Sequence, residues 1–202
     1  KGDDFFALDV TKEGLEILIK NPDVKSIFTR KISTITLSDS TSLINADNVW
    51  IVQLNSINIT GKNQTVCIVD SGINYTHQDL GGCPYNNNIN TANCSKVIGG
   101  YDYVNLDDNP LDDNGHGTHV SGIVSANGTL KGVAIESRLV ALKACNINGT
   151  CSDVAMINSL KWCNSNSSLY NIKVISISIG NNVSYSSDNC PTWLDQEIND
   201  AY

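Results

Sequence analysis

The sequence predicts an α/β fold in which a parallel β-sheet is flanked by helices. From Thr65 onward, strand-like apolar segments alternate with segments of helical spacing, and this alternation requires right-handed crossovers that build a parallel sheet. The run from Thr65 to Val69 is apolar almost throughout, which is typical of a strand buried on both faces. At 202 residues and 41% hydrophobic, the chain suits one globular domain, or one domain with a small neighbour.

The N-terminal segment predicts a small strand–helix–strand unit. Residues 4–10 form a short apolar run, and Thr11 is placed to cap a helix over residues 13–20. The sequence Asn-Pro-Asp at 21–23 ends that helix, and residues 24–36 resume a β-like pattern. The unit is too small to bury much core alone, so we expect it to pack on something else.

The α/β pattern begins only after an irregular stretch. Residues 37–64 are polar, apart from the apolar run Val49–Leu54. Beyond them the pattern predicts four strands and three helices. The strands are expected at Thr65–Val69, Lys96–Val104, Arg138–Ala144 and Lys173–Ile179, and the helices at His116–Ala126, Ser152–Cys163 and Thr192–Tyr202.

The charge balance argues against a nucleic-acid partner. The net charge is −8, and the arginines are only Arg30 and Arg138, so no basic face is available for phosphates. The sequence contains no apolar run of about 18 residues, and it does not open on a signal peptide. We therefore expect no transmembrane segment in these residues, and both ends read as truncations.

The seven cysteines indicate an oxidising compartment, and hence an extracellular or cell-surface protein. Eight Asn-X-Ser/Thr sequons fit an exported glycoprotein, although an asparagine-rich chain also produces such triplets by chance. Six of the cysteines lie in polar stretches and allow about 15 pairings, with scattered free thiols as the alternative. We expect the pairs Cys83–Cys94, Cys145–Cys151 and Cys163–Cys190, with Cys67 buried and unpaired in its apolar strand.

Two short segments supply an acid and a base. Asp70 ends the strand Val66–Val69, at the sheet edge where ligands of α/β folds bind. His116 stands between Gly115 and Gly117 at the predicted start of a helix. A carboxylate can hold the proton of one ring nitrogen and leave the other nitrogen free as a base. We predict that Asp70 orients His116, with a capping histidine in a glycine-rich turn as the alternative.

These segments resemble the aspartate and histidine motifs of the subtilisin-like (subtilase) serine proteases. The motif sequences are V-C-I-V-D-S-G-I and N-G-H-G-T-H-V-S-G. The resemblance implies a three-layer fold with the parallel sheet between helices, and it places Asp70 and His116 at catalytic positions. It makes His119 a structural histidine. Residues 76–80 resemble the segment that follows the catalytic aspartate.

A third match concerns the substrate. Residues 174–180, V-I-S-I-S-I-G, resemble the family strand that pairs with the substrate backbone. The resemblance places Ser178, Ile179 and Gly180 along the non-primed subsites of a polypeptide substrate, which would bind by strand addition. The alternative for Lys173–Ile177 is a plain buried parallel strand.

The resemblance also divides the chain. Residues 1–40 resemble the tail of the inhibitor-like prosegment, which would be a partner of the catalytic domain, and residues 41–202 its N-terminal part. The family's Gly-Thr-Ser nucleophile motif and its oxyanion asparagine segment do not occur in the sequence, so we expect this chain by itself to be inactive. The loop over residues 126–132 is short and lacks acids, so no calcium, other metal or cofactor is assigned, although Asp79 is a candidate oxygen ligand.

The resemblance implies a secreted serine endopeptidase with an Asp-His-Ser acyl-enzyme mechanism. One alternative is a metal hydrolase, because His116 and His119 are one helical turn apart and acidic residues lie at 70, 112 and 113. The glutamate of an HExxH motif is missing, however. The other alternative is a pseudoprotease that holds peptides along Ser178–Gly180 without cutting them.

Overall fold

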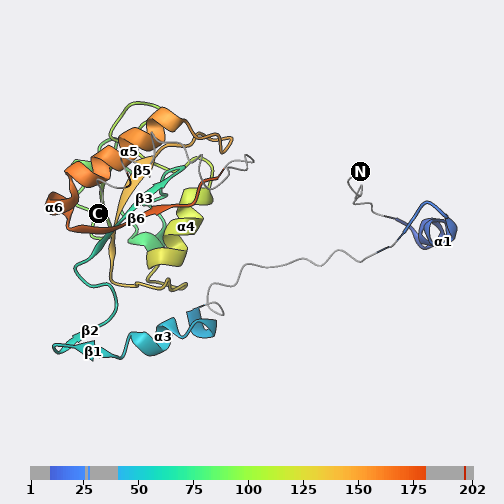
Figure 1. Cartoon of the computed structure of the whole chain (residues 1–202), viewed down its shortest axis with the longest axis horizontal. Helices are drawn as coiled ribbons and strands as arrows, with labels where there is room; N and C mark the ends of the chain where they lie inside the picture. The colour runs from blue at the N-terminus through green and yellow to red at the C-terminus, as the bar shows by residue number, and fades with distance from the viewer. Residues whose placement is uncertain (1–9, 26, 28–40, 181–197, 199–202) are drawn as a thin grey trace, which may run out of the picture. The chain divides into compact units, whose positions relative to one another are not determined.

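The computed structural model describes residues 10–25, 27, 41–180 and 198 (Figure 1). The chain divides into two compact units, Lys1–Ile35 and Thr36–Tyr202. In the first unit, helix α1 spans Lys12–Lys20, and its Gly14 amide donates to the Thr11 hydroxyl over 3.2 Å. The predicted helix and its cap are confirmed. The strands expected at 4–10 and 24–36 lie outside the described residues, except for four residues that are not in a strand.

Within its described residues, the second unit is built on a four-stranded parallel sheet. Its strands lie in the order β4 (Val97–Asp102), β5 (Arg138–Lys143), β3 (Thr65–Asp70) and β6 (Ile172–Ile177). All four predicted strands are confirmed, with ends shifted by one or two residues. β3 lies between β5 and β6, and all six of its residues are buried. The continuous apolar run thus identified a central strand.

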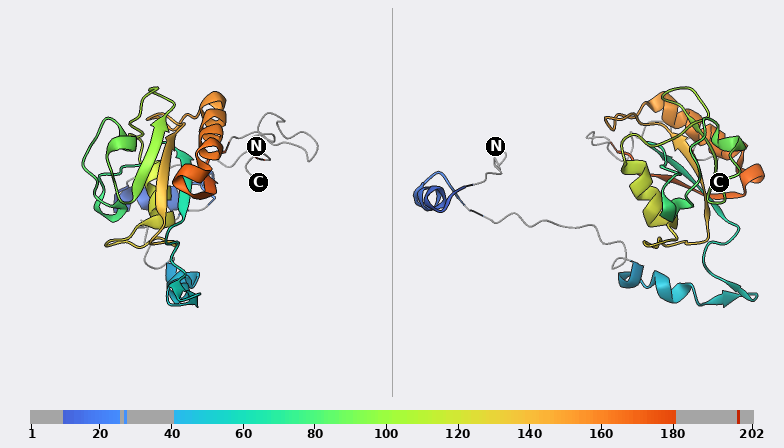
Figure 2. Two further views of the ribbon diagram at one scale, coloured as in Figure 1. Left: turned by 90° about the vertical axis from the view of Figure 1, so that its left-hand side faces the viewer. Right: turned by 180° about the vertical axis from the view of Figure 1, so that it is seen from behind.

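Two helices cover opposite faces of this sheet (Figure 1, Figure 2). Val66 and Ile68 of β3 pack on the face of helix α4 (His116–Ser125), which contributes Val120 and Val124. Cys67 and Val69 pack on the other face, against helix α5 (Asp153–Ser165). Successive strand residues point to opposite faces, so each helix receives every second side chain. The predicted three-layer arrangement is confirmed.

The segment before β3 has more structure than its sequence indicates. Helix α3 (Ala46–Val49) is followed by a hairpin of β1 (Gln53–Leu54) and β2 (Ile57–Asn58). The hairpin turns at Asn55 and Ser56, which both have positive φ. The apolar run Val49–Leu54 is therefore split between a helix end and a strand. The shorter elements are η1 (Gln78–Leu80), η2 (Ile89–Thr91) and α6 (Ser167–Tyr170).

Three disulfides lie within the described residues. The predicted pairs Cys83–Cys94 and Cys145–Cys151 are present. The prediction for Cys67 and Cys163 is wrong, because these two cysteines are joined to each other. Cys67 points from β3 towards α5, and Cys163 lies on the buried face of α5, so their Cα atoms are 6.3 Å apart. Cys190 lies outside the described residues.

The helix expected at Thr192–Tyr202 also lies outside the described residues, apart from Ile198. Among the described helices, none is both long enough and apolar enough to cross a bilayer.

Candidate active site

The carboxylate of Asp70 is held firmly at the end of β3. The residue is 2% exposed, and its backbone oxygen accepts from the amides of Ala144 and Cys145 over 2.8 and 3.1 Å. The Ser71 amide donates to Oδ1 of Asp70 over 2.7 Å. Both the backbone and the side chain of Asp70 are therefore fixed by neighbouring amides.

His116 meets this carboxylate from the start of α4. Its Nδ1 lies 2.8 Å from Oδ1 and 3.0 Å from Oδ2 of Asp70, and its side chain is 53% exposed. Because a carboxylate only accepts, Nδ1 donates to it, and in the neutral ring this leaves Nε2 as the nitrogen without a proton. The structure thus brings the two predicted residues into hydrogen-bonding contact.

The turn before α4 places the ring. Gly115 has φ of 103°, a conformation that side chains rarely adopt, and it caps the helix directly before His116. The amide of His116 also donates to the side-chain oxygen of Asn114, over 3.2 Å. Gly115 therefore provides the turn from which α4 begins.

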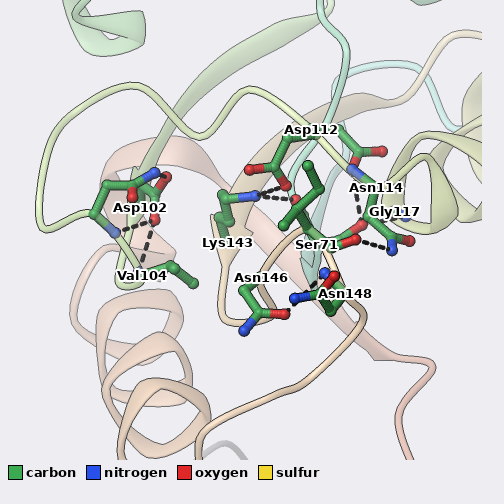
Figure 3. Close-up of polar contacts among 12 residues, drawn as sticks. Ser71, Asp102, Val104, Asp112, Asn114, Gly117, Lys143, Asn146 and Asn148 are labelled. Carbon is green, nitrogen blue, oxygen red and sulfur yellow. Dashed lines mark hydrogen bonds and ion pairs between the residues drawn. The ribbon is translucent and has the colours of Figure 1, made fainter.

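A polar network ties the two motifs together (Figure 3). The Ser71 hydroxyl donates to Oδ1 of Asp112 over 2.8 Å and accepts the Gly117 amide over 2.9 Å. Ser71 is 1% exposed and its hydroxyl is engaged on both sides, so it is not available as a nucleophile.

Asp112 is the centre of the loop before α4. It accepts the amides of Asn114, Gly115 and Thr118 over 2.8–3.0 Å, and the Thr118 hydroxyl as well. Burial opposes ionisation of this carboxyl, but these hydrogen bonds outweigh it and lower its pKa below the usual value. The ionised carboxylate of Asp112 therefore fixes the turn that leads into His116.

The predicted substrate strand, β6, is an edge strand of the sheet in the described part of the chain. There β6 hydrogen-bonds with β3 alone, and Val174 is 54% exposed. Of the residues of β6, only Ile172 is buried within the part of the chain that the structure describes. Ser178, Ile179 and Gly180 follow β6, with Ser178 and Gly180 exposed. Because β3 and β6 are parallel, residues 178–180 follow the carboxyl end of β6 on the same side of the sheet as Asp70, which is at the carboxyl end of β3.

The carboxylate of the candidate calcium ligand Asp79 accepts hydrogen bonds from backbone amides of this chain. The residue is 8% exposed, and its carboxylate accepts the amides of Thr129 and Leu130 over 2.9 and 3.1 Å. Across the described ranges, no three His, Cys, Asp or Glu side chains are grouped so as to hold a metal ion. His119 is exposed on α4. The metal-hydrolase alternative therefore finds no ligand set among these residues.

Sequence reasoning missed Lys143. This lysine ends β5, is 0% exposed, and donates to the Ser71 carbonyl over 2.9 Å. It also forms an ion pair with Asp113. The available signal was a lysine directly after the apolar run Leu139–Leu142.

Comparison with known proteins gives a consistent family match. Residues 61–201 match the model of the Subtilase family. The chain is 31% identical over 181 residues to "Serine protease AprX" of Bacillus subtilis (strain 168), covering 85% of this chain and 37% of that protein. It is 32% identical over 146 residues to "Thermitase" of Thermoactinomyces vulgaris, covering 70% of this chain and 44% of that protein.

A solved structure described as a cold adapted subtilisin-like serine proteinase shares the fold. Its TM-score is 0.54 at 24% identity, over 77% of this chain and 50% of that one. The chain spans less than half the length of the two curated relatives named above.

Proposed function

This chain belongs to the subtilase family, and we propose that it supplies the aspartate and the histidine of a serine endopeptidase. The observation that carries the proposal is the contact of His116 Nδ1 with the buried Asp70 carboxylate at 2.8 Å, on a ring that is half exposed. This arrangement produces a histidine with a free Nε2, which is what a general base requires.

The proposed reaction is acyl transfer. Nε2 of His116 takes the proton of a serine hydroxyl as the serine oxygen attacks the scissile carbonyl, and Asp70 stabilises the imidazolium that forms. His116 then gives the proton to the leaving amine, and a water repeats the sequence to release the acyl group. No Gly-Thr-Ser sequence occurs in the 202 residues and Ser71 is occupied, so the proposal takes the nucleophile from outside them.

We infer that the substrates are polypeptides bound in extended form. The exposed residues Ser178 and Gly180 follow the carboxyl end of β6, and Asp70 lies at the carboxyl end of the adjacent parallel strand β3. An extended peptide placed beside them would gain main-chain hydrogen bonds by strand addition. The proposal assigns no metal or cofactor to the described residues.

We also propose that the protein is secreted and that residues 1–40 are the tail of its prosegment. Three disulfides among the described residues support an oxidising compartment. A relative 30% identical over 190 residues is named "Minor extracellular protease Epr" of Bacillus subtilis (strain 168). The glycoprotein and zymogen assignments belong to the same proposal.

Peptide hydrolysis by a form of the protein that contains a Gly-Thr-Ser segment tests the function. His116→Ala should lower kcat at least about a thousandfold, because the oriented base is lost. The matched control is His77→Asn, which keeps a side-chain acceptor for the cap of η1 and should retain activity. Activity in His116→Ala within tenfold of the unaltered protein would refute the assigned role. Peptide binding without hydrolysis in the unaltered protein would favour the pseudoprotease.

A further inference from the structure

A fully buried lysine lies beneath the candidate active site. In the register of β3 with β5, Lys143 pairs directly with Asp70, and both residues are the last of their strands. The alternation of β5 places Leu139 and Ala141 in the core on the α4 face, so Lys143 points to that face as well. Lys143 is therefore on the same side of the sheet as Asp70 and His116.

The surroundings of the ammonium are specific. Burying an isolated charge is costly, and the cost is offset only by good hydrogen bonds and an opposite charge. Lys143 has both, from the Ser71 carbonyl oxygen at 2.9 Å and from the carboxylate of Asp113. The side chain of Asp113 is 43% exposed, so the acid remains partly in water while the lysine is fully enclosed.

The two partners belong to different segments. Ser71 follows Asp70 at the end of β3, whereas Asp113 lies three residues before His116 in the loop that leads into α4. Figure 3 shows the Lys143 side chain reaching towards Ser71 and the loop that contains Asp112 and Asn114. One ammonium group thus joins the segment that carries the acid to the segment that carries the base.

We propose that Lys143 is a positioning residue for the Asp70–His116 pair. By joining Ser71 to Asp113, it sets the distance between the strand end and the loop, and thereby the contact of His116 Nδ1 with Asp70. Its charge also offsets that of Asp113, which leaves Asp70 as the carboxylate that directs the ring. The catalytic consequence depends on the proposed protease function, but the geometry does not.

The tautomer of His116 reports on this role directly. A proton on Nδ1 is fixed by the bond to Asp70, so a loosened contact shifts the proton towards Nε2. Nitrogen-15 NMR of protein labelled at histidine measures the two forms without substrate or nucleophile. The sequence contains three histidines, and His77→Asn and His119→Ala assign their signals.

Lys143→Met should raise the Nε2–H fraction of His116 at least twofold and weaken the low-field proton resonance of the Nδ1–H bond. The matched control is Lys96→Met. Lys96 also donates to a backbone carbonyl, that of Ile135 at 2.6 Å, but it precedes β4 at the opposite end of the sheet from Asp70. The control should leave the His116 signals unchanged even where it alters stability.

Asp113→Ala provides a second test if Lys143→Met does not fold. It removes the tether between Lys143 and the loop at a partly exposed position, and it should shift the tautomer in the same direction. The inference is overturned if His116 keeps its tautomer and its low-field resonance in the folded variants, or if Lys96→Met shifts them equally. If the variants shift the His116 signals as expected but the unaltered protein, with its Nδ1–H signal present, hydrolyses no peptide, the result counts against the proposed function and not against this inference.

Discussion

Gly117 lies directly against the carbonyl oxygen of Gly72: a Cβ on Gly117 would stand 2.1 Å from that oxygen and 3.1 Å from the Cβ of Asp70. The first turn of α4 can therefore approach the end of β3 only because residue 117 has no side chain. This approach is what brings His116 within reach of the Asp70 carboxylate.

Gly117→Ala should consequently separate the acid from the base. Backbone atoms cannot yield as a flexible side chain can, so we expect a loss of about 1–3 kcal/mol in the free energy of unfolding. The same variant should lose the Nδ1–H signal of His116. Chemical denaturation and histidine NMR measure the two effects.

The same helix offers a control for this substitution. A Cβ on Gly122 would meet nothing within 4 Å, so Gly122→Ala should stabilise α4 by up to about 1 kcal/mol through helix propensity. Equal effects of the two alanines on stability and on the His116 signal would contradict the steric argument.

Because of Asp112, the free energy of unfolding should fall as the pH becomes acidic. Burial opposes ionisation, but the hydrogen bonds that its carboxylate accepts prevail, so its folded pKa lies below the unfolded value of 3.8. Its contribution is then fully present above that value and is lost as the pH falls through the lower folded pKa. Asp112→Asn should cost roughly 2 kcal/mol at pH 7, with a smaller difference below pH 4. A difference that does not change with pH would contradict this.

Lys96 should make the free energy of unfolding rise with pH as well, but in the alkaline range. It lines a polar cavity of about 300 Å³ with Glu136 and Arg138. Burial lowers its pKa to about 8, a shift that Glu136 only partly opposes. The unfolded state therefore binds the extra proton between about pH 8 and 10.5, and stability rises with pH across that window.

After allowance for solvent screening, the gain attributable to Lys96 should be about 1–2 kcal/mol. The free energy of unfolding is measured at pH 8 and pH 10 for the unaltered protein and for Lys96→Met. Titrating groups that both proteins share contribute equally, so the difference between the two changes belongs to Lys96. The rise should be smaller in the variant by this amount, and parallel curves would show that Lys96 is not the source.

The Cys67–Cys163 disulfide should contribute more to the free energy of unfolding than Cys83–Cys94 does. Cys67–Cys163 closes a separation of 96 residues, whereas Cys83–Cys94 closes one of 11. On the chain-entropy account, replacing both cysteines by alanine costs about 4–5 kcal/mol in the first case and about 3 kcal/mol in the second. Denaturant unfolding under oxidising conditions compares them. A larger loss for Cys83–Cys94 would show that loop closure does not set the order.

The sequence predicts the sheet well because its signal is local. The strands contain short apolar runs, and the uninterrupted run Val66–Val69 indicated a strand buried on both faces, as β3 is. The hairpin at Asn55 and Ser56 escaped prediction because serine is an uncommon residue at positive φ and the strands are two residues long.

The site divides in the same way. Asp70 and His116 stand out because each lies in a short motif, and the structure adds their contact. The roles of Lys143 and Cys67 depend on which strand or helix becomes a neighbour, and that information is distributed over some hundred residues. Inside an apolar strand, a disulfide cysteine has the same appearance as a small hydrophobic residue.

The bond between Cys67 and Cys163 also imposes an order of events during synthesis. At about 5–20 residues per second, Cys67 waits roughly 5–20 s for its partner, while four other cysteines appear before it. Disulfides form on a timescale of seconds or longer, so a wrong partner is within reach during that interval. The thiol of Cys67 faces the side of the sheet that α5 covers, so it stays uncovered until α5 has been made, and only then is the strand that carries Asp70 covalently locked. Maturation of the acid's strand is thus tied to the arrival of a helix that takes no part in the chemistry.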